Sequence, residues 1–262
     1  MSGGFAGWLG RHALTGFFGM AYVISWSLWL VSYLVGGGTG RAIFLLGGFG
    51  PMAAAAIVIY LTGDSVAEWI RSIFTFRASG GFYLYALGVP VALYAAANLL
   101  LAALGEPVEA SLLVGRIPDY LSTFAFVAVL GGGQEEPGWR GFALPRLQER
   151  HTPVRATLIL GLLWGVWHVP LYGPLGFIVP LVLAFFYTFL FNRTGSIVMC
   201  VLLHGTFTAA QDHLILLDDI TEGVTDVAIG LSYVAGVILL LSLTRGRLGR
   251  RSLPVGEGKL KV

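Results

Sequence analysis

Three short clusters of polar and ionisable residues interrupt the apolar stretches of this 262-residue chain. In chain order they are the segments GGGQEEPGWRG at 131–141, WGVWHVP at 164–170 and LHGTFT at 203–208. Carboxylates, imidazoles and hydroxyls are groups that activate water and stabilise the negative charge that forms on an attacked carbonyl. The clusters therefore predict hydrolytic chemistry if the fold brings them together.

The first cluster places two carboxylates side by side near a predicted helix start. Its three glycines disfavour a continuous helix, and Pro137 suits the first turn of a new one because its missing N–H has no helical partner there. Glu136 and Arg140 are then i,i+4 neighbours that can pair, while Glu135 points about 100° away. We expect Arg140 to hold Glu136 and to leave Glu135 free. The alternative is a charged helix end that only anchors the segment at the membrane interface.

Each of the other two clusters carries a histidine on a predicted helix face. His168 shares a face with Trp164, and Pro170 frees a backbone carbonyl nearby. His204 shares a face with Thr208. Taken alone, either histidine is also explained as a packing residue bonded to a neighbouring helix.

The depth of the clusters indicates whether they can meet. At 1.5 Å per residue, Glu135, His168 and His204 each lie roughly 16–20 Å of helix from an arginine on the same side of the membrane, so one layer can contain all three. Glu135 would take a proton from water and return it to the leaving amine, while His168 orients that water. His204 and Thr208 would donate hydrogen bonds to the oxyanion. The set suits amide hydrolysis.

A zinc site is the alternative interpretation of the same residues. Glu135, His168 and His204 are ligand types that zinc accepts, and zinc would activate the water instead. The chain contains no H-E-x-x-H motif, and pairing of Glu136 with Arg140 would compete with carboxylate ligation. The sequence alone does not separate the two mechanisms, and we expect the one without a cofactor.

The segments that position these clusters are too apolar for a water-soluble protein. Hydrophobic residues make up 56% of the chain, charged residues only 11%, and the mean hydropathy is +0.80, whereas soluble chains carry about 25% charged residues. The composition predicts a polytopic membrane protein. A net charge of +2 without a dense basic face argues against nucleic acid as a partner. The single cysteine, Cys200, leaves no intrachain disulfide.

Apolar runs long enough for a spanning helix, about 20 residues, occur eight times. They cover residues 14–35, 42–62, 82–104, 118–134, 156–172, 175–191, 195–212 and 226–244. The expected fold is an all-α transmembrane helical bundle of about eight spanning helices, with no signal peptide removed. Residues 64–77 place Trp69, Ile70, Ile73 and Phe74 near one helical face, which is typical of a helix lying in the interface, although an ordinary loop helix fits equally well.

The distribution of lysine and arginine predicts the orientation of the bundle. With both ends in the cytosol, fourteen of the 16 basic residues fall in inner segments and only Arg41 and Arg116 fall outside. We therefore expect residues 1–245 to form a single transmembrane domain with both termini cytosolic. The glycine-rich basic segment 246–262 is expected to be a disordered cytosolic tail near anionic lipid.

The three motifs resemble those of a known family. GQEEPGWRGFALPRLQ, WGVWHVP and LLHGTFTAA, in this order within about residues 118–212, are similar to the CPBP family of intramembrane proteases, which includes the type II CAAX prenyl endopeptidases and bacterial homologues. The family's motif residues match Glu135, Glu136, Arg140, Trp164, His168 and His204.

The resemblance implies a glutamate-dependent endopeptidase that cuts membrane-associated peptides or protein tails, in the plasma membrane of a prokaryote. In that family the residues matching Glu135 and His168 activate water, and the third motif, from His204 onward, supplies the oxyanion site. That motif usually ends in asparagine, whereas Thr208 stands there in this chain, and its hydroxyl can still donate one hydrogen bond. The alternative, which Thr208 favours, is a non-catalytic membrane partner or transporter that uses the polar cavity for binding.

Overall fold

The chain is helical throughout the part that the structure, a computed structural model, describes, namely residues 4–219 and 223–250. The α-helices are α1 (Phe5–Arg11), α2 (Ala13–Val35), α3 (Gly37–Gly47), α4 (Gly50–Thr62), α5 (Val66–Ile73), α6 (Gly80–Ala103), α7 (Leu112–Phe126), α8 (Glu136–Gly138), α9 (Leu144–Gln148), α10 (Pro153–Tyr172), α11 (Ile178–Thr194), α12 (Ile197–His213) and α13 (Val224–Thr244). Two π-helical turns, η1 (Val127–Gly131) and η3 (Trp139–Ala143), and one 3-10 turn, η2 (Gly133–Glu135), interrupt the stretch between α7 and α9. The expected all-α class is confirmed.

Among the described residues, the structure supports five or six of the eight predicted spanning helices. Five helical stretches are long and apolar enough to cross a membrane, namely α2, α6, the stretch Leu112–Gln148, α10 and α13, and α3 with α4 adds a sixth as a pair bent by 49°. The other two predicted spans are α11 and α12, which have 17 residues each. Such helices cover about 26 Å, which is shorter than a hydrocarbon core of about 30 Å.

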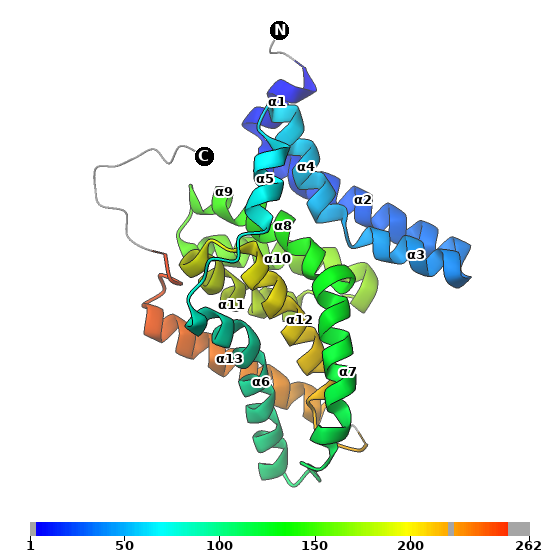
Figure 1. Ribbon diagram of the computed structural model, residues 1–262, viewed down its shortest axis with the longest axis vertical. Helices are drawn as coiled ribbons and strands as arrows, with labels where there is room; N and C mark the ends of the chain where they lie inside the picture. The colour runs from blue at the N-terminus through cyan, green and yellow to red at the C-terminus, as the bar shows by residue number, and fades with distance from the viewer. Residues whose placement is uncertain (1–3, 220–222, 251–262) are drawn as a thin grey trace.

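The helices are arranged around α12. This helix contacts α6, α7, α11 and the broken stretch from η1 to η3. Helices α1, α5 and α9 gather at one end of the molecule, and the α6–α7 connection lies at the opposite end (Figure 1). Helices α2 and α3 run side by side away from this centre (Figure 1). Because α12 is surrounded, its third-cluster residues face protein instead of lipid.

Local sequence signals account for the starts of the two histidine-bearing helices. Thr152 caps α10 by accepting a hydrogen bond from the Arg155 N–H at 3.3 Å, and Pro153 occupies the first turn. Ser196 caps α12 in the same way through the Met199 N–H at 3.4 Å. The caps fix where each helix begins, and therefore how deep in the bundle each histidine lies.

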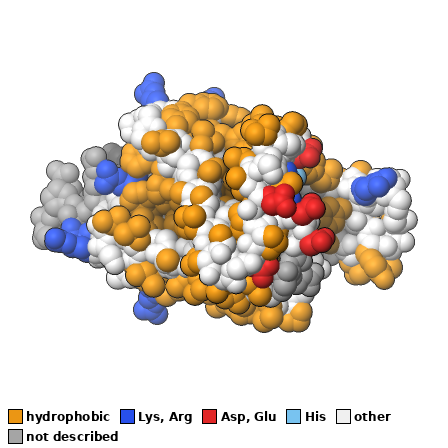
Figure 2. All heavy atoms as spheres, turned by 90° about the horizontal axis from the view of Figure 1, so that it is seen from below, with side chains coloured by type: hydrophobic (Ala, Val, Ile, Leu, Met, Phe, Trp, Pro, Cys, Tyr) orange, Lys and Arg blue, Asp and Glu red, His pale blue; other side chains and the backbone are white. Residues whose placement is uncertain are grey.

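The outer surface of the bundle is largely apolar. Large side chains such as Tyr33, Leu84 and Leu243 are 83%, 74% and 75% exposed, which a protein in water would rarely tolerate over a contiguous surface. Seen from the end that carries the α6–α7 connection, hydrophobic side chains dominate, acidic side chains form one cluster, and lysines and arginines lie toward the edges (Figure 2). These features fit a multi-pass integral membrane protein.

Two peripheral predictions meet the structure in different ways. The segment 64–77 contains α5, which Ser65 caps, with Ile70 and Phe74 exposed; its placement in the membrane interface stays a prediction. The disordered tail expected from residue 246 is wrong for residues 246–250, because Leu248 is fully buried and its carbonyl accepts a hydrogen bond from Asn192 at 2.9 Å. Residues 251–262 of that tail lie outside the described residues.

Candidate active site

The first cluster forms a break between helices that Gln134 bridges. The side-chain Oε1 of Gln134 accepts a hydrogen bond from the Gly132 N–H at 2.8 Å, and its Nε2 donates to the Leu130 carbonyl at 2.9 Å. The chain then passes through η2 into α8, with Pro137 in the first turn. The sequence correctly predicted a break at the glycines and a helix start at the proline.

Two glycines of the break are required by close approaches of other segments. A Cβ atom on Gly132 would lie 2.3 Å from Nε2 of His204, and one on Gly138 would lie 2.5 Å from the carbonyl oxygen of Pro51. No real Cβ atom tolerates such distances, so a side chain at either position would displace its neighbour. Gly132 thus makes room for the imidazole of the third cluster, and Gly138 lets α8 pack on α4.

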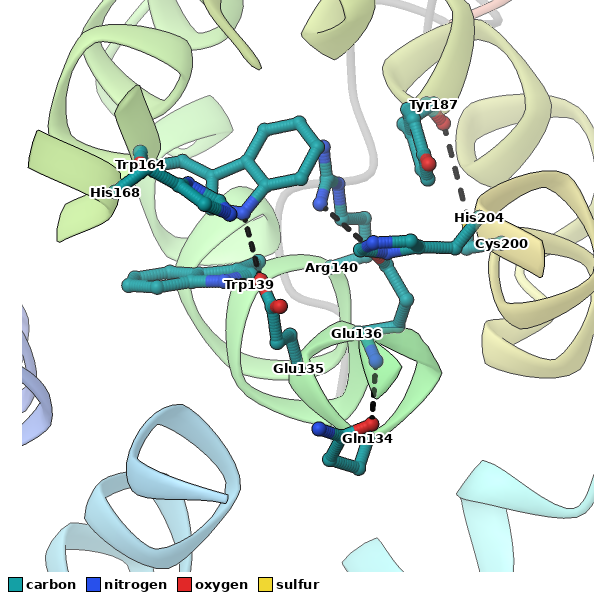
Figure 3. Close-up of polar contacts among 11 residues, drawn as sticks. Gln134, Glu135, Glu136, Trp139, Arg140, Trp164, His168, Tyr187, Cys200 and His204 are labelled. Carbon is teal, nitrogen blue, oxygen red and sulfur yellow. Dashed lines mark hydrogen bonds and ion pairs between the residues drawn. The ribbon is translucent and has the colours of Figure 1, made fainter. Parts of the chain in front are cut away.

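Glu135 is held by two tryptophans. Its Oε2 accepts hydrogen bonds from the indole N–H of Trp164 at 2.8 Å and from that of Trp139 at 3.1 Å. Its Oε1 accepts none from the described residues. The side chain is 4% exposed and lines a cavity. Figure 3 shows this carboxylate turned toward the tryptophans and away from Arg140.

Glu136 and Arg140 form the predicted pair. Arg140 Nη1 lies 3.0 Å from Glu136 Oε1, and the same oxygen accepts a hydrogen bond from His204 Nδ1 at 2.8 Å (Figure 3). Both side chains of the pair are fully buried. The guanidinium carbon lies 4.1 Å from the ring centroids of both Trp164 and Tyr187, so two aromatic faces hold the cation.

His168 is fixed in one tautomer by a backbone carbonyl. Its Nδ1 lies 2.9 Å from the Trp164 carbonyl oxygen, and a carbonyl oxygen only accepts, so Nδ1 carries the proton. When the ring is neutral, Nε2 is therefore a hydrogen-bond acceptor. The ring is 7% exposed and lines the same cavity as Glu135.

One cavity of about 420 Å³ brings the three clusters together. Glu135, His168, His204 and Thr208 all line it, beside aromatic and aliphatic side chains from α2, α3, α10 and α11. Thr208 is half-buried, and its hydroxyl makes no hydrogen bond within the part of the chain described. Glu136 and Arg140 are absent from the lining and lie behind it. The structure thus brings residues of all three clusters to one cavity.

Sequence reasoning missed three residues of this arrangement. Trp139 lies four residues after Glu135, and this helical spacing could have indicated its contact with the carboxylate. Gln134 and Tyr187 gave no comparable signal, because the bridge made by Gln134 depends on the helix break and Tyr187 reaches Arg140 from a different helix.

The alternative zinc site is not assembled by these residues. Among the described residues, no three histidine, cysteine, aspartate or glutamate side chains are arranged to hold one metal ion. Oε2 of Glu135 already accepts two indole N–H groups, and Nδ1 of His204 is engaged by Glu136. One atom of each residue stays open, namely Oε1 of Glu135 and Nε2 of His168 and His204, but among the described residues these side chains are not gathered into a metal-binding group.

Comparison with known proteins agrees with this geometry. A family model described as type II CAAX prenyl endopeptidase Rce1-like matches residues 117–210. CAAX prenyl protease 2 of Methanococcus maripaludis is 41% identical to the chain over 46 residues, which are 18% of this chain and 17% of that relative. The matched segment contains all three motifs and the cavity-lining residues Glu135, His168, His204 and Thr208. Residues 117–210 therefore match the Rce1-like type II CAAX prenyl endopeptidase family, also called the CPBP family, which is a class of membrane peptidases.

Proposed function

We propose that this chain is an intramembrane endopeptidase that hydrolyses peptide bonds in membrane-associated peptides or protein tails. The observation that carries the proposal is the shared cavity, in which a carboxylate with one unoccupied oxygen faces the same space as two imidazoles and a hydroxyl. Family membership of residues 117–210 supports the same reaction class.

Water activation is assigned to Glu135 and His168. Oε1 of Glu135 accepts no hydrogen bond from the residues that the structure describes, so it takes the proton as the water oxygen attacks the scissile carbonyl carbon. His168, with its proton fixed on Nδ1, accepts the second water proton in a hydrogen bond at Nε2 and so orients the nucleophile. Glu135 then returns its proton to the leaving nitrogen as the C–N bond breaks, which yields a carboxylic acid and an amine.

Oxyanion stabilisation is assigned to His204 and Thr208. Because Nδ1 of His204 donates to the Glu136 carboxylate, Nε2 can donate to an oxyanion only when the ring is an imidazolium. The Glu136 carboxylate, whose Oε1 accepts the Nδ1 proton at 2.8 Å, is the anion next to that ring. The Thr208 hydroxyl is the second donor.

In this mechanism Glu136 and Arg140 are positioning residues. They do not reach the cavity, but the Glu136–His204 bond aims the imidazole past Gly132 toward it. The two aromatic faces on Arg140 keep the guanidinium from turning toward Glu135. The base therefore keeps its own hydrogen-bond partners.

The substrate class follows from the cavity lining and from the relative. Trp29, Phe44 and Phe126 are among the apolar side chains around the site, so apolar residues should flank the cleaved bond. The relative's name, CAAX prenyl protease 2, makes prenylated protein tails one substrate to test. The match spans 17% of that relative, so its substrate is carried over only as a proposal.

The decisive experiment compares the wild-type protein with Glu135→Gln. Purified protein in lipid nanodiscs is incubated with a library of apolar and prenylated peptides, and products are identified by mass spectrometry. We expect cleavage by the wild type and by Glu149→Gln, a control variant at an exposed glutamate, and none by Glu135→Gln. Peptide binding without cleavage by any form would favour the non-catalytic partner or transporter.

We also propose that both termini are cytosolic, as the basic residues indicate. Because the only native cysteine, Cys200, is buried, cysteines introduced at Ser2 and Gly256 report cleanly. An impermeant thiol reagent should not label either one in intact cells and should label both after lysis. Efficient labelling of one in intact cells would overturn the orientation.

A further inference from the structure

We propose that Trp139 and Trp164 act as a pair of indole N–H donors that select which oxygen of Glu135 works as the base. The inference rests on the proposed function, since it assigns a role within the same site. Both indoles donate to Oε2, at 3.1 Å and 2.8 Å. The proton taken from water is therefore directed to Oε1.

The two donors are held rigidly enough to impose that choice. Trp139 is fully buried and packs against Phe17 and Trp167, with ring centroids 5.4 Å and 5.8 Å away. Trp164 is 2% exposed and packs against Tyr187 at 5.4 Å. A buried aromatic ring in close contact on several sides has one orientation, so each N–H stays aimed at the carboxylate.

Trp164 also connects the base to the rest of the site. Its indole N–H donates a hydrogen bond to Glu135, and its ring stacks on the guanidinium of Arg140 at 4.1 Å. Its carbonyl oxygen accepts a hydrogen bond from Nδ1 of His168 at 2.9 Å. One residue of α10 thus sets the relative positions of the base, the water-orienting histidine and the cation behind them. Replacement by phenylalanine keeps the ring face and the carbonyl and removes only the N–H.

The chain supplies a matched control for losing a tryptophan N–H. Trp167 lies on the same helix, is 1% exposed, and has its ring centroid 4.8 Å from that of His168. Its indole N–H is buried yet donates no hydrogen bond within the described residues. Trp167→Phe therefore makes the same chemical change next to the site without touching Glu135.

The test measures kcat, KM and the pH–activity profile for Trp139→Phe, Trp164→Phe, the double variant and Trp167→Phe, on a peptide that the wild type cleaves. Donors to a carboxylate favour its charged form, so losing both should move the acidic limb of the double variant's profile about one unit to higher pH. The other charged or titratable groups around Glu135 are unchanged in it, namely Glu136, Arg140, His168, Tyr172, Tyr187 and His204. We expect its kcat to fall roughly 10–100-fold at neutral pH with KM within about 3-fold of wild type, and smaller effects from the single variants. Trp167→Phe should keep its limb at the wild-type pH.

Each outcome decides the inference. A double variant with the wild-type limb and kcat, while Glu135→Gln is inactive, overturns the indole pair and leaves the proposed function standing. An equal fall of activity at all pH values also overturns it, because that pattern reports fewer folded molecules. If the double variant does not fold, benzothienylalanine is introduced at residue 164, because it keeps the two-ring shape and lacks the N–H. The acidic limb of its pH–activity profile should then also move to higher pH, and a wild-type limb would overturn the inference. Turnover by Glu135→Gln at the wild-type rate would instead refute the proposed function.

Discussion

Glu135 and Glu136 are neighbours in the chain but belong to two different layers of the site. The open layer, Glu135, His168 and Thr208, lines the cavity, whereas the sealed layer, Glu136 and Arg140, is fully buried behind it. His204 joins them, because its Nδ1 bonds to Glu136 while the ring lines the cavity. The comparison teaches that a catalytic base such as Glu135 must reach the cavity with one oxygen open to water. A positioning residue such as Glu136 instead stays buried and bound to the same partners, Arg140 and His204.

The two layers also differ in what a substitution removes. A buried ion pair contributes little compared with well-packed apolar groups, yet removing one partner costs about 3–5 kcal/mol because a charge is left uncompensated. The side chains of the open layer form no such buried ion pair, so replacing one of them leaves no uncompensated charge behind. The same substitution should therefore lower turnover when it is made in the open layer and lower the free energy of unfolding when it is made in the sealed layer.

The largest expected effect is the loss of turnover in Glu135→Gln with folding retained. The glutamine keeps the shape and its amide oxygen can still accept both indole N–H groups, but it cannot take a proton. Glu136→Gln should instead lower the free energy of unfolding by about 3–5 kcal/mol, because Arg140 loses its buried partner. Turnover and thermal unfolding of both variants check this, and wild-type turnover in both would remove the glutamate mechanism.

The next largest effect tests the junction between the layers. In Gly132→Ala the new Cβ would lie 2.3 Å from Nε2 of His204, so the imidazole must move away from Glu136 or from the cavity. A misplacement of this size is expected to lower kcat on the order of 10²-fold. Gly115→Ala in α7, where no atom lies within 4 Å of the new Cβ, is the control and should keep the wild-type rate. Equal rates for the two variants would contradict the close approach.

A smaller effect is expected from Thr208, at the edge of the open layer. Thr208→Val preserves the shape and deletes the hydroxyl, so we expect at least a roughly tenfold loss of kcat, with His204 left as the remaining donor. Thr208→Asn should be tolerated, because the amide N–H₂ also donates from the same helix face. Steady-state kinetics of both variants measure this. If Thr208→Val keeps the wild-type kcat while His204→Ala is inactive, His204 alone holds the oxyanion and Thr208 only packs.

The sequence predicted the parts of this site that depend on spacing along one helix. The Glu136–Arg140 pair follows from i,i+4 spacing and forms at 3.0 Å, even though α8 gives way to the π-helical turn η3 between them. The contact of Trp164 with Glu135 joins residues 29 positions apart, which no local pattern encodes. At α11 and α12 apolar run length alone leaves a membrane span a prediction, because a helix buried among others is apolar for packing as well as for lipid contact.

The smallest expected effect, no change at all, concerns metal chelators. A zinc ion would need Glu135, His168 and His204 to be gathered around one point. Within the described residues these three side chains do not form a metal-binding group. Activity in EDTA or 1,10-phenanthroline should therefore equal that in buffer. Loss of activity that zinc specifically restores would show that the two layers rearrange around a metal, and it would move water activation from Glu135 to that ion.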